Sequence, residues 1–237
     1  MSATSGTTSA AAGLDAAMRA QRGHAACLVL FPLLFLVFAG TDVHPDPSGD
    51  TAADQVRAVA ARAGAWQVAH LVLAAASLLG MGAVLGLHSL IPRSGRLSVA
   101  AATSATLGVA AAGLAAGILL MEAALVGPSA KACAATSACL ASDNEPFLGE
   151  FANRSWNDVA HLSYAVGTLL FSLAALAVLG WVARSARPWE AVAMGVGIVG
   201  IYATNTALHG DARYGLAFVL VASASIALRM ERSRQHG

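Results

Sequence analysis

Two apolar segments of the chain begin with the same short pattern around a histidine. The first reads AWQVAHL and contains His70, and the second reads SWNDVAHL and contains His161. Each places a polar side chain three residues before the histidine, Gln67 in the first and Asp158 in the second, so each pair shares one face of a helix. Imidazole binds protons, haem iron and transition metals. We therefore expect any chemistry to centre on these two histidines.

More polar side chains lie near the ends of other apolar segments. Glu122 is one, and His209, four residues after Asn205, is another. An unpaired ionisable group inside a membrane costs several kcal/mol, so such groups usually face the interior of a helix bundle and mark function. We expect Glu122, Asp158 and His209 to lie at the same depth as the two histidines, near the outer face of a membrane.

The composition places the chain in a membrane. Of its 237 residues 57% are hydrophobic and 11% are charged, whereas about 25% are charged in an ordinary soluble domain. The net charge of +1 gives no field that would attract nucleic acid, so no nucleic-acid partner is expected. The lipid bilayer is the first expected partner, and a membrane electron-transfer or subunit partner is the second.

Six apolar segments predict an all-α, polytopic integral membrane protein. Each is near or above the length of about 17–20 helical residues that crosses the hydrocarbon core. The six predicted spans form a transmembrane domain over residues 23–230, at about 24–40, 66–90, 98–126, 157–183, 189–208 and 213–229.

Arginines predict the orientation of these spans. Nine of the fourteen basic residues flank the same ends of the segments, and the positive-inside rule makes that side cytoplasmic. They are Arg19, Arg22, Arg93, Arg96, Arg184, Arg187, Arg229, Arg232 and Arg234. We therefore expect a multi-pass protein of the cell membrane with both termini in the cytoplasm.

The two ends of the chain are polar. Residues 1–22 are small and polar and are expected to form a disordered cytoplasmic tail, and residues 231–237 form a basic cytoplasmic C-terminus. A cleaved signal peptide is the alternative for the first segment. Cleavage after Ala39 would leave five spans.

Two cysteines lie in the expected outer loop at residues 128–156. Because the outside of the cell is oxidising, we predict a disulfide between Cys133 and Cys139. By the loop-entropy model such a short bridge contributes about 2 kcal/mol.

The chain carries signs of an internal repeat. The AHL around His70 recurs around His161, and RSGR at residues 93–96 recurs as RSAR at residues 184–187, both with an offset of 91 residues. We predict that spans two to five form a duplicated four-helix bundle. The duplication would place His70 and His161 symmetrically about an axis along the membrane normal.

The first interpretation of these residues is haem b held between His70 and His161. Symmetric histidines on diagonal helices can bracket an iron atom on the axis. This layout is similar to that of membrane cytochromes with bis-histidine haem. The resemblance is limited to the helix arrangement over four spans and implies a redox protein.

The second interpretation is a non-haem transition metal. The imidazole and carboxylate ligands would come from His70, Glu122, Asp158, His161 and His209. Such a protein could be a metal-dependent membrane enzyme acting on a lipid or another apolar substrate.

The third interpretation needs no cofactor. The polar residues pair with one another and fix helix packing, as in a structural or accessory membrane subunit. The sequence leaves all three interpretations open, with a histidine-centred cofactor site near the outer face as the first choice. It does not decide whether the chain is an enzyme.

Overall fold

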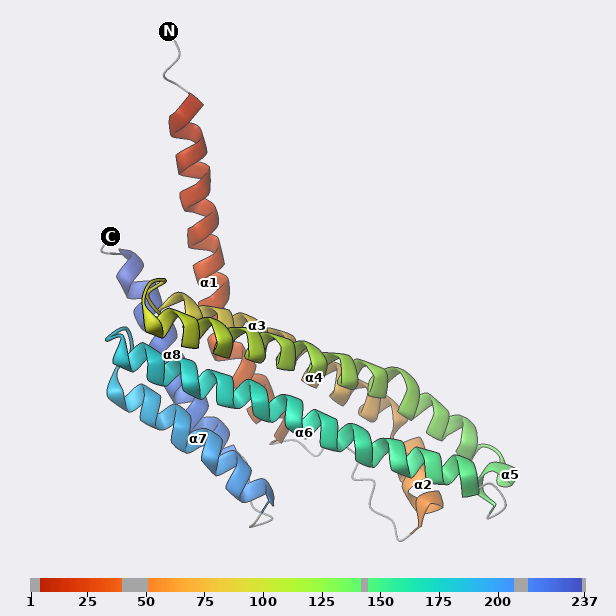
Figure 1. Ribbon diagram of the computed structural model, residues 1–237. Coiled ribbons are helices and arrows are strands. Elements are labelled where there is room, and N and C mark those ends of the chain that lie inside the picture. Colours follow the sequence, from red (N-terminus) through yellow and green to blue (C-terminus); the bar gives the residue numbers. More distant parts are fainter. Residues whose placement is uncertain (1–4, 40–50, 142–144, 207–212, 236–237) are drawn as a thin grey trace.

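The computed structural model describes residues 5–39, 51–141, 145–206 and 213–235 (Figure 1). Within these ranges side chains are described at residues 16–38, 51, 53–54, 56–141, 161–201 and 213–232. All the regular secondary structure in these ranges is helical. Its elements are α1 (Ser5–Ala39), α2 (Ala52–Ala61), α3 (Ala63–Ser89), α4 (Arg96–Ala134), α5 (Ser137–Leu140), α6 (Glu145–Val182), α7 (Pro188–Thr206) and α8 (Arg213–Gln235).

Five of these helices are long and apolar enough to cross a membrane, so the chain is a multi-pass membrane protein by the hydropathy of its helices. The candidate spans are Ala16–Phe38, Ala63–Ser89, Arg96–Ala134, His161–Val182 and Arg213–Arg232. The apolar part of α7, Pro188–Ile201, is shorter. The prediction of an all-helical membrane protein is confirmed, while the sixth span stays a prediction.

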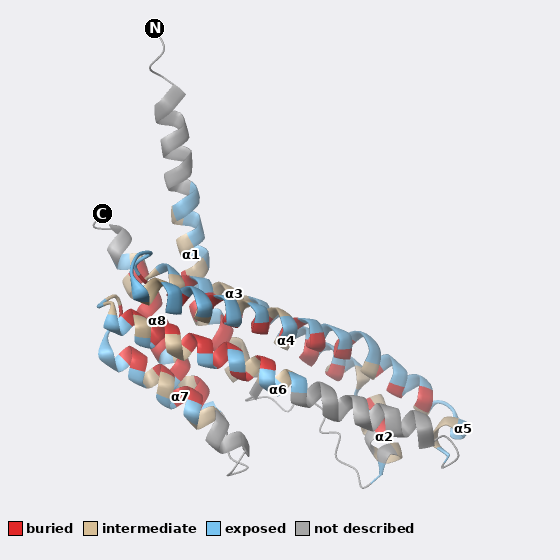
Figure 2. Cartoon of the chain, in the orientation of Figure 1, coloured by how far each residue is buried: buried red, intermediate tan, exposed pale blue. Residues whose placement is uncertain are grey.

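The six long helices pack in chain order around a closed ring. α3 contacts α1 and α4, α4 contacts α6, α6 contacts α7, and α8 contacts both α7 and α1. α3 also contacts α6 across the ring. The buried residues form one large core on the facing sides of these helices (Figure 2). Small side chains allow the close approach, because a Cβ added to Gly108 would lie 2.8 Å from the Cβ of Ser172 and 2.9 Å from Val84.

Large apolar side chains cover much of the outer surface of the ring, where lipid tails would contact them. Exposed members on α3 and α4 are Val68, Leu71, Val72, Leu78, Leu85, Val99, Leu107, Leu114, Leu120, Met121 and Leu125. This pattern is what embedding in a lipid bilayer requires, since a bundle in hydrocarbon has no polar solvent to face.

The two ends of the bundle differ. The α3–α4 and α6–α7 connections lie at one end, called the turn end here, while α3, α4 and α6 extend together toward α2 and α5 at the other (Figure 1). A second, smaller core lies at that far end. It joins Val56 and Val59 of α2 to Trp66 of α3 and to Ala130 and Cys133 of α4. We call α2, α5 and the adjoining end of α4 the cap.

Two predicted boundaries differ from the structure. The third span was expected to end at residue 126, before Gly127 and Pro128, but α4 continues to Ala134. Its last turns are held by burial of Ala130 and Cys133 in the cap core, and this packing outweighs the helix-breaking tendency of proline. Likewise α1 begins at Ser5, so the described part of the expected tail at residues 1–22 is helical.

The RSGR and RSAR motifs adopt different backbone conformations. In the α3–α4 connection the residue with positive φ is Gly95, at 89°, whereas in the α6–α7 connection it is Arg184, at 60°. These are different positions of the motif. The two histidines of the repeat also differ, since His70 is buried and His161 is exposed. The duplication therefore stays a prediction.

Candidate functional site

The buried His70 and Glu122 side chains meet between α3 and α4. The Nε2 atom of His70 lies 3.0 Å from Oε2 of Glu122, and the two side chains are only 4% and 8% exposed. The helices bring them together because α3 and α4 pack against each other along their lengths. Two ionisable groups so deeply buried are stable only when they satisfy each other.

Trp66 completes the surroundings of His70. One turn earlier on α3, its carbonyl oxygen lies 2.8 Å from His70 Nδ1. Its indole ring stacks on the imidazole, with ring centroids 4.4 Å apart and planes inclined by 26°. Because a carbonyl oxygen only accepts hydrogen bonds, this contact assigns the donated proton to Nδ1.

The contact with Glu122 then involves a second proton between Nε2 and Oε2. Either an imidazolium donates to a carboxylate, or a protonated carboxyl group donates to a neutral imidazole. In both states the two nitrogens of His70 are engaged by atoms of the chain itself. The pair can therefore hold a proton between two helices without any further group.

The His70–Glu122 pair lies at the junction of the two cores. Trp66, which stacks on His70, belongs to the cap core, whereas Ala112, ten residues before Glu122 on α4, belongs to the large core. Glu122 lies about 39 Å along α4 from Arg96, at a rise of about 1.5 Å per residue. A hydrocarbon core about 30 Å thick that begins near Arg96 would end about 9 Å before Glu122, so the pair would lie in the interfacial region beyond it.

The other predicted site residues lie elsewhere or outside the description. His161 is on α6 with its side chain exposed. The Asp158 side chain and the whole of His209 lie outside the described residues. Among the side chains that the structure describes, no three His, Cys, Asp or Glu residues gather as a metal site. Of the five predicted metal ligands, the structure thus brings together His70 and Glu122.

The predicted disulfide is present in the structure. Cys133 and Cys139 are joined, with an S–S distance of 2.03 Å and a Cα–Cα distance of 5.3 Å. The bond connects the end of α4 to α5, and Cys133 is buried in the cap core. It therefore stabilises the cap beyond the His70–Glu122 pair.

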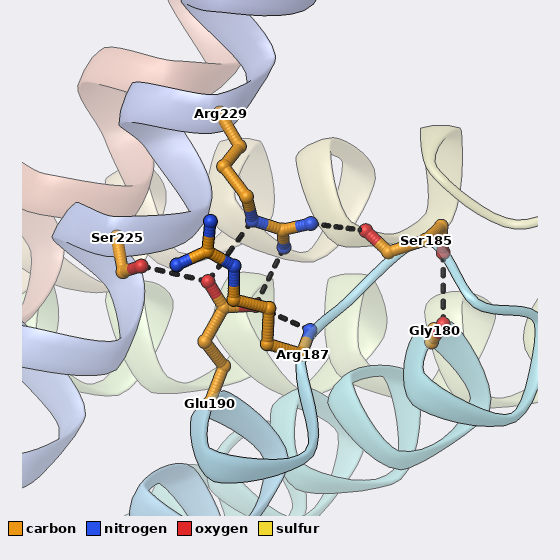
Figure 3. A network of polar contacts seen from close by, with 6 residues as sticks. All are labelled: Gly180, Ser185, Arg187, Glu190, Ser225 and Arg229. Carbon is orange, nitrogen blue, oxygen red and sulfur yellow. Dashed lines mark hydrogen bonds and ion pairs between the residues drawn. The ribbon is translucent and has the colours of Figure 1, made fainter.

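A second buried polar cluster, at the turn end, was missed by sequence reasoning (Figure 3). Glu190 of α7 is fully buried and forms an ion pair with Arg229 of α8. Its Oε1 accepts hydrogen bonds from Ser225 Oγ at 2.7 Å and Arg229 Nε at 3.0 Å. Its Oε2 accepts one from the backbone N–H of Arg187 at 2.7 Å.

The local sequence contains a signal for part of this cluster. Glu190 occupies the third position of α7, after Pro188 at the first, and a Glu there commonly accepts a hydrogen bond from the N-cap backbone. The Arg229 contact joins elements far apart in the sequence and has no local signal. Arg229 was instead interpreted only as a charge that flanks the last span.

Comparisons of this chain with protein-family models, with curated proteins and with solved structures find no match.

Proposed function

We propose that this chain is a non-catalytic membrane protein, structural or accessory to others, in which the His70–Glu122 pair joins the cap to the membrane bundle. One observation carries the proposal. Both ring nitrogens of His70 are engaged, Nδ1 by the Trp66 carbonyl and Nε2 by Glu122, inside a buried site. A histidine satisfied in this way serves helix packing without any added ligand.

Binding of haem b would require the contacts of His70 to rearrange, whereas the packing role uses them as they are. Iron ligation by His70 would use Nε2, which Glu122 already contacts, and would leave a buried carboxylate to be satisfied by another group. The expected second axial ligand, His161, has an exposed side chain on α6. The geometry therefore favours packing over haem, although the two proposals remain distinguishable by experiment.

A non-haem metal is the second candidate, because His70 and Glu122 already converge. An imidazole nitrogen and a carboxylate oxygen 3.0 Å apart are two ligand types that zinc or iron accepts. A metal between them would need further ligands, for which Asp158, His161 and His209 are the sequence-based candidates. Such a site would lie at the junction of the cap and the bundle.

The test uses full-length protein in mild detergent, expressed with haem and metals available, as wild type, His70→Ala and His161→Ala. The His161 variant is a matched control, because it removes the same residue from the same AHL motif at an exposed position. We would record the dithionite-reduced minus oxidised absorption spectrum, the elemental content and the thermal unfolding of each.

The packing proposal expects no haem band and no stoichiometric metal in the wild type. It expects a lower unfolding temperature for His70→Ala and an unchanged one for His161→Ala, since only His70 is buried against a partner. A haem band lost in both variants would overturn the proposal in favour of a bis-histidine cytochrome. Stoichiometric metal lost in His70→Ala and in Glu122→Gln would establish the metal site instead.

A further inference from the structure

The connection between α6 and α7 surrounds an open hollow at the turn end. Its volume is about 500 Å³, and it is lined by Trp181, Val182, Arg184, Ala186, Arg187 and Pro188. Arg184 and Arg187 are exposed, as are the neighbouring apolar side chains of Trp181 and Val182. The hollow is thus lined by two arginines, an aromatic residue and an aliphatic residue at the end of α6.

The backbone here holds an arginine where glycine is normally favoured. α6 ends in a Schellman motif, in which the N–H of Ser185 donates to the Gly180 carbonyl at 2.8 Å and that of Arg184 donates to the Trp181 carbonyl at 2.8 Å. Arg184 occupies the left-handed position, with φ of 60°. A non-glycine residue there costs about 1 kcal/mol. A strained residue that also carries a charge into a hollow points to a functional requirement for the side chain.

The buried cluster beneath the hollow fixes this geometry. Arg229 Nη1 donates to the Ser185 carbonyl at 2.7 Å, and Glu190 accepts from the Arg187 backbone N–H at 2.7 Å. Both oxygens of Glu190 are occupied by these contacts and by the ion pair with Arg229. Glu190 therefore has Arg229 as its ion-pair partner, and its contacts hold the backbone of the α6–α7 connection in place.

We propose that this hollow binds the phosphate group of an anionic ligand, with Arg184 and Arg187 as its charged contacts. Guanidinium groups match the geometry and charge of phosphate oxygens. The place at the end of α6, beside Trp181 and Val182, suits a phospholipid whose acyl chains continue along the apolar helix surface. A free phosphate compound from water would share the same charged contacts without those apolar ones.

The test uses full-length protein in mild detergent and three probes, which are a phosphatidylglycerol, a phosphatidylcholine of the same chain length and inorganic phosphate. Binding is followed by the shift in unfolding temperature and by native mass spectrometry of the bound lipid. The variants are the double substitution Arg184→Gly/Arg187→Gln and the single substitution Arg184→Gly. The matched control is Arg93→Gln with Arg96→Gln, two exposed arginines in the related motif at the same end of the bundle.

We expect phosphatidylglycerol to stabilise the wild type more than phosphatidylcholine does. The apparent affinity should fall at least fivefold in Arg184→Gly/Arg187→Gln and stay within twofold in the control. Because glycine relieves the left-handed strain, Arg184→Gly alone should unfold at the same temperature as the wild type or higher without lipid, so weaker binding cannot be ascribed to misfolding.

Two other results are informative. Inorganic phosphate that stabilises the wild type as well as phosphatidylglycerol does, with the same loss in the double variant, would support the phosphate site and assign it to a soluble ligand. Equal responses of the double variant and the control to phosphatidylglycerol would overturn the proposal.

Discussion

The Nε2 atom of His70 and the Oε2 atom of Glu122 lie 3.0 Å apart between α3 and α4, in side chains that are almost completely buried. The contact fixes the sliding position of one helix against the other, because a shift by one turn would leave both groups in an apolar environment. It also lies where the membrane bundle meets the cap, next to Trp66. In the proposed role the pair aligns the membrane bundle with the cap.

Removing one partner of this pair should lower the free energy of unfolding more than removing both partners does. His70→Leu leaves the Glu122 carboxyl group buried without its imidazole, and we expect a loss of about 2–3 kcal/mol in the free energy of unfolding. Adding Glu122→Met replaces both polar groups by apolar ones of similar size, so the double variant should recover most of that loss. Equilibrium unfolding in detergent micelles compares the wild type, His70→Leu, Glu122→Met and the double variant.

His161→Leu serves as the control for this comparison, because it makes the same change at an exposed site. It should unfold like the wild type. A double variant whose loss equals or exceeds the sum of the two single losses would show that the pair does not act as a coupled unit.

The sequence predicts the class of the fold well. Long runs of Ala, Leu and Gly with few charges identify membrane helices without any knowledge of their neighbours. The end of α4 could not be predicted in this way. Gly127 and Pro128 indicate a helix end locally, and only the cap core, built with residues of α2, explains why the helix continues.

The candidate site could be predicted in part. The rarity of ionisable residues in membrane segments directs attention to His70 and Glu122, but the sequence does not say which of the polar residues meet. The AHL repeat suggested that His70 and His161 have equivalent roles, whereas burial separates them. Short motifs do not encode the orientation of a helix in the ring, which depends on all the helices that contact it.

The disulfide should stabilise the cap more than the membrane bundle. Breaking it in Cys133→Ser/Cys139→Ser releases a short loop between α4 and α5, and the loop-entropy model gives a loss of about 2 kcal/mol. We expect faster amide hydrogen exchange in α5 and in the last turns of α4. Exchange in α3 near Val84 should not change, since Val84 belongs to the large core. Uniformly faster exchange in both regions would contradict a local role.

The start of α2 should respond to acid. Thr51 and Asp54 form a reciprocal cap, in which Asp54 N–H donates to Thr51 Oγ1 at 3.2 Å and Thr51 Oγ1 donates to Asp54 Oδ2 at 2.7 Å. The side-chain hydrogen bond from Thr51, and then the nearby Arg57 guanidinium, lower the pKa of Asp54. A carboxyl group whose pKa is lower in the folded state stabilises that state at neutral pH.

This stabilisation is present above the unfolded-state pKa of about 3.9 and is lost as the pH falls through the lower folded-state value. Amide exchange in α2, corrected for the intrinsic pH dependence, should therefore accelerate as the pH falls from roughly 5 to 2, the range around that reference pKa. In Asp54→Asn the exchange should be faster at neutral pH and should change little with acid. A pH response of equal size in Asp54→Asn would show that another group causes it.

The contact between α7 and α8 should depend on glycine at one position. A Cβ added to Gly197 would lie 2.7 Å from the backbone oxygen of Gly215 and 2.9 Å from Val219, too close for the helices to keep their present separation. Gly197→Ala should therefore reduce the free energy of unfolding by about 1–3 kcal/mol.

Gly117 on α4 provides a matched control, because a Cβ there would meet no atom within 4 Å. Since alanine favours helix more than glycine does, Gly117→Ala should leave stability unchanged or raise it by up to about 1 kcal/mol. Thermal unfolding of the two variants in the same detergent tests the difference, and equal stabilities would mean that α7 and α8 do not approach as closely as Gly197 and Gly215 indicate.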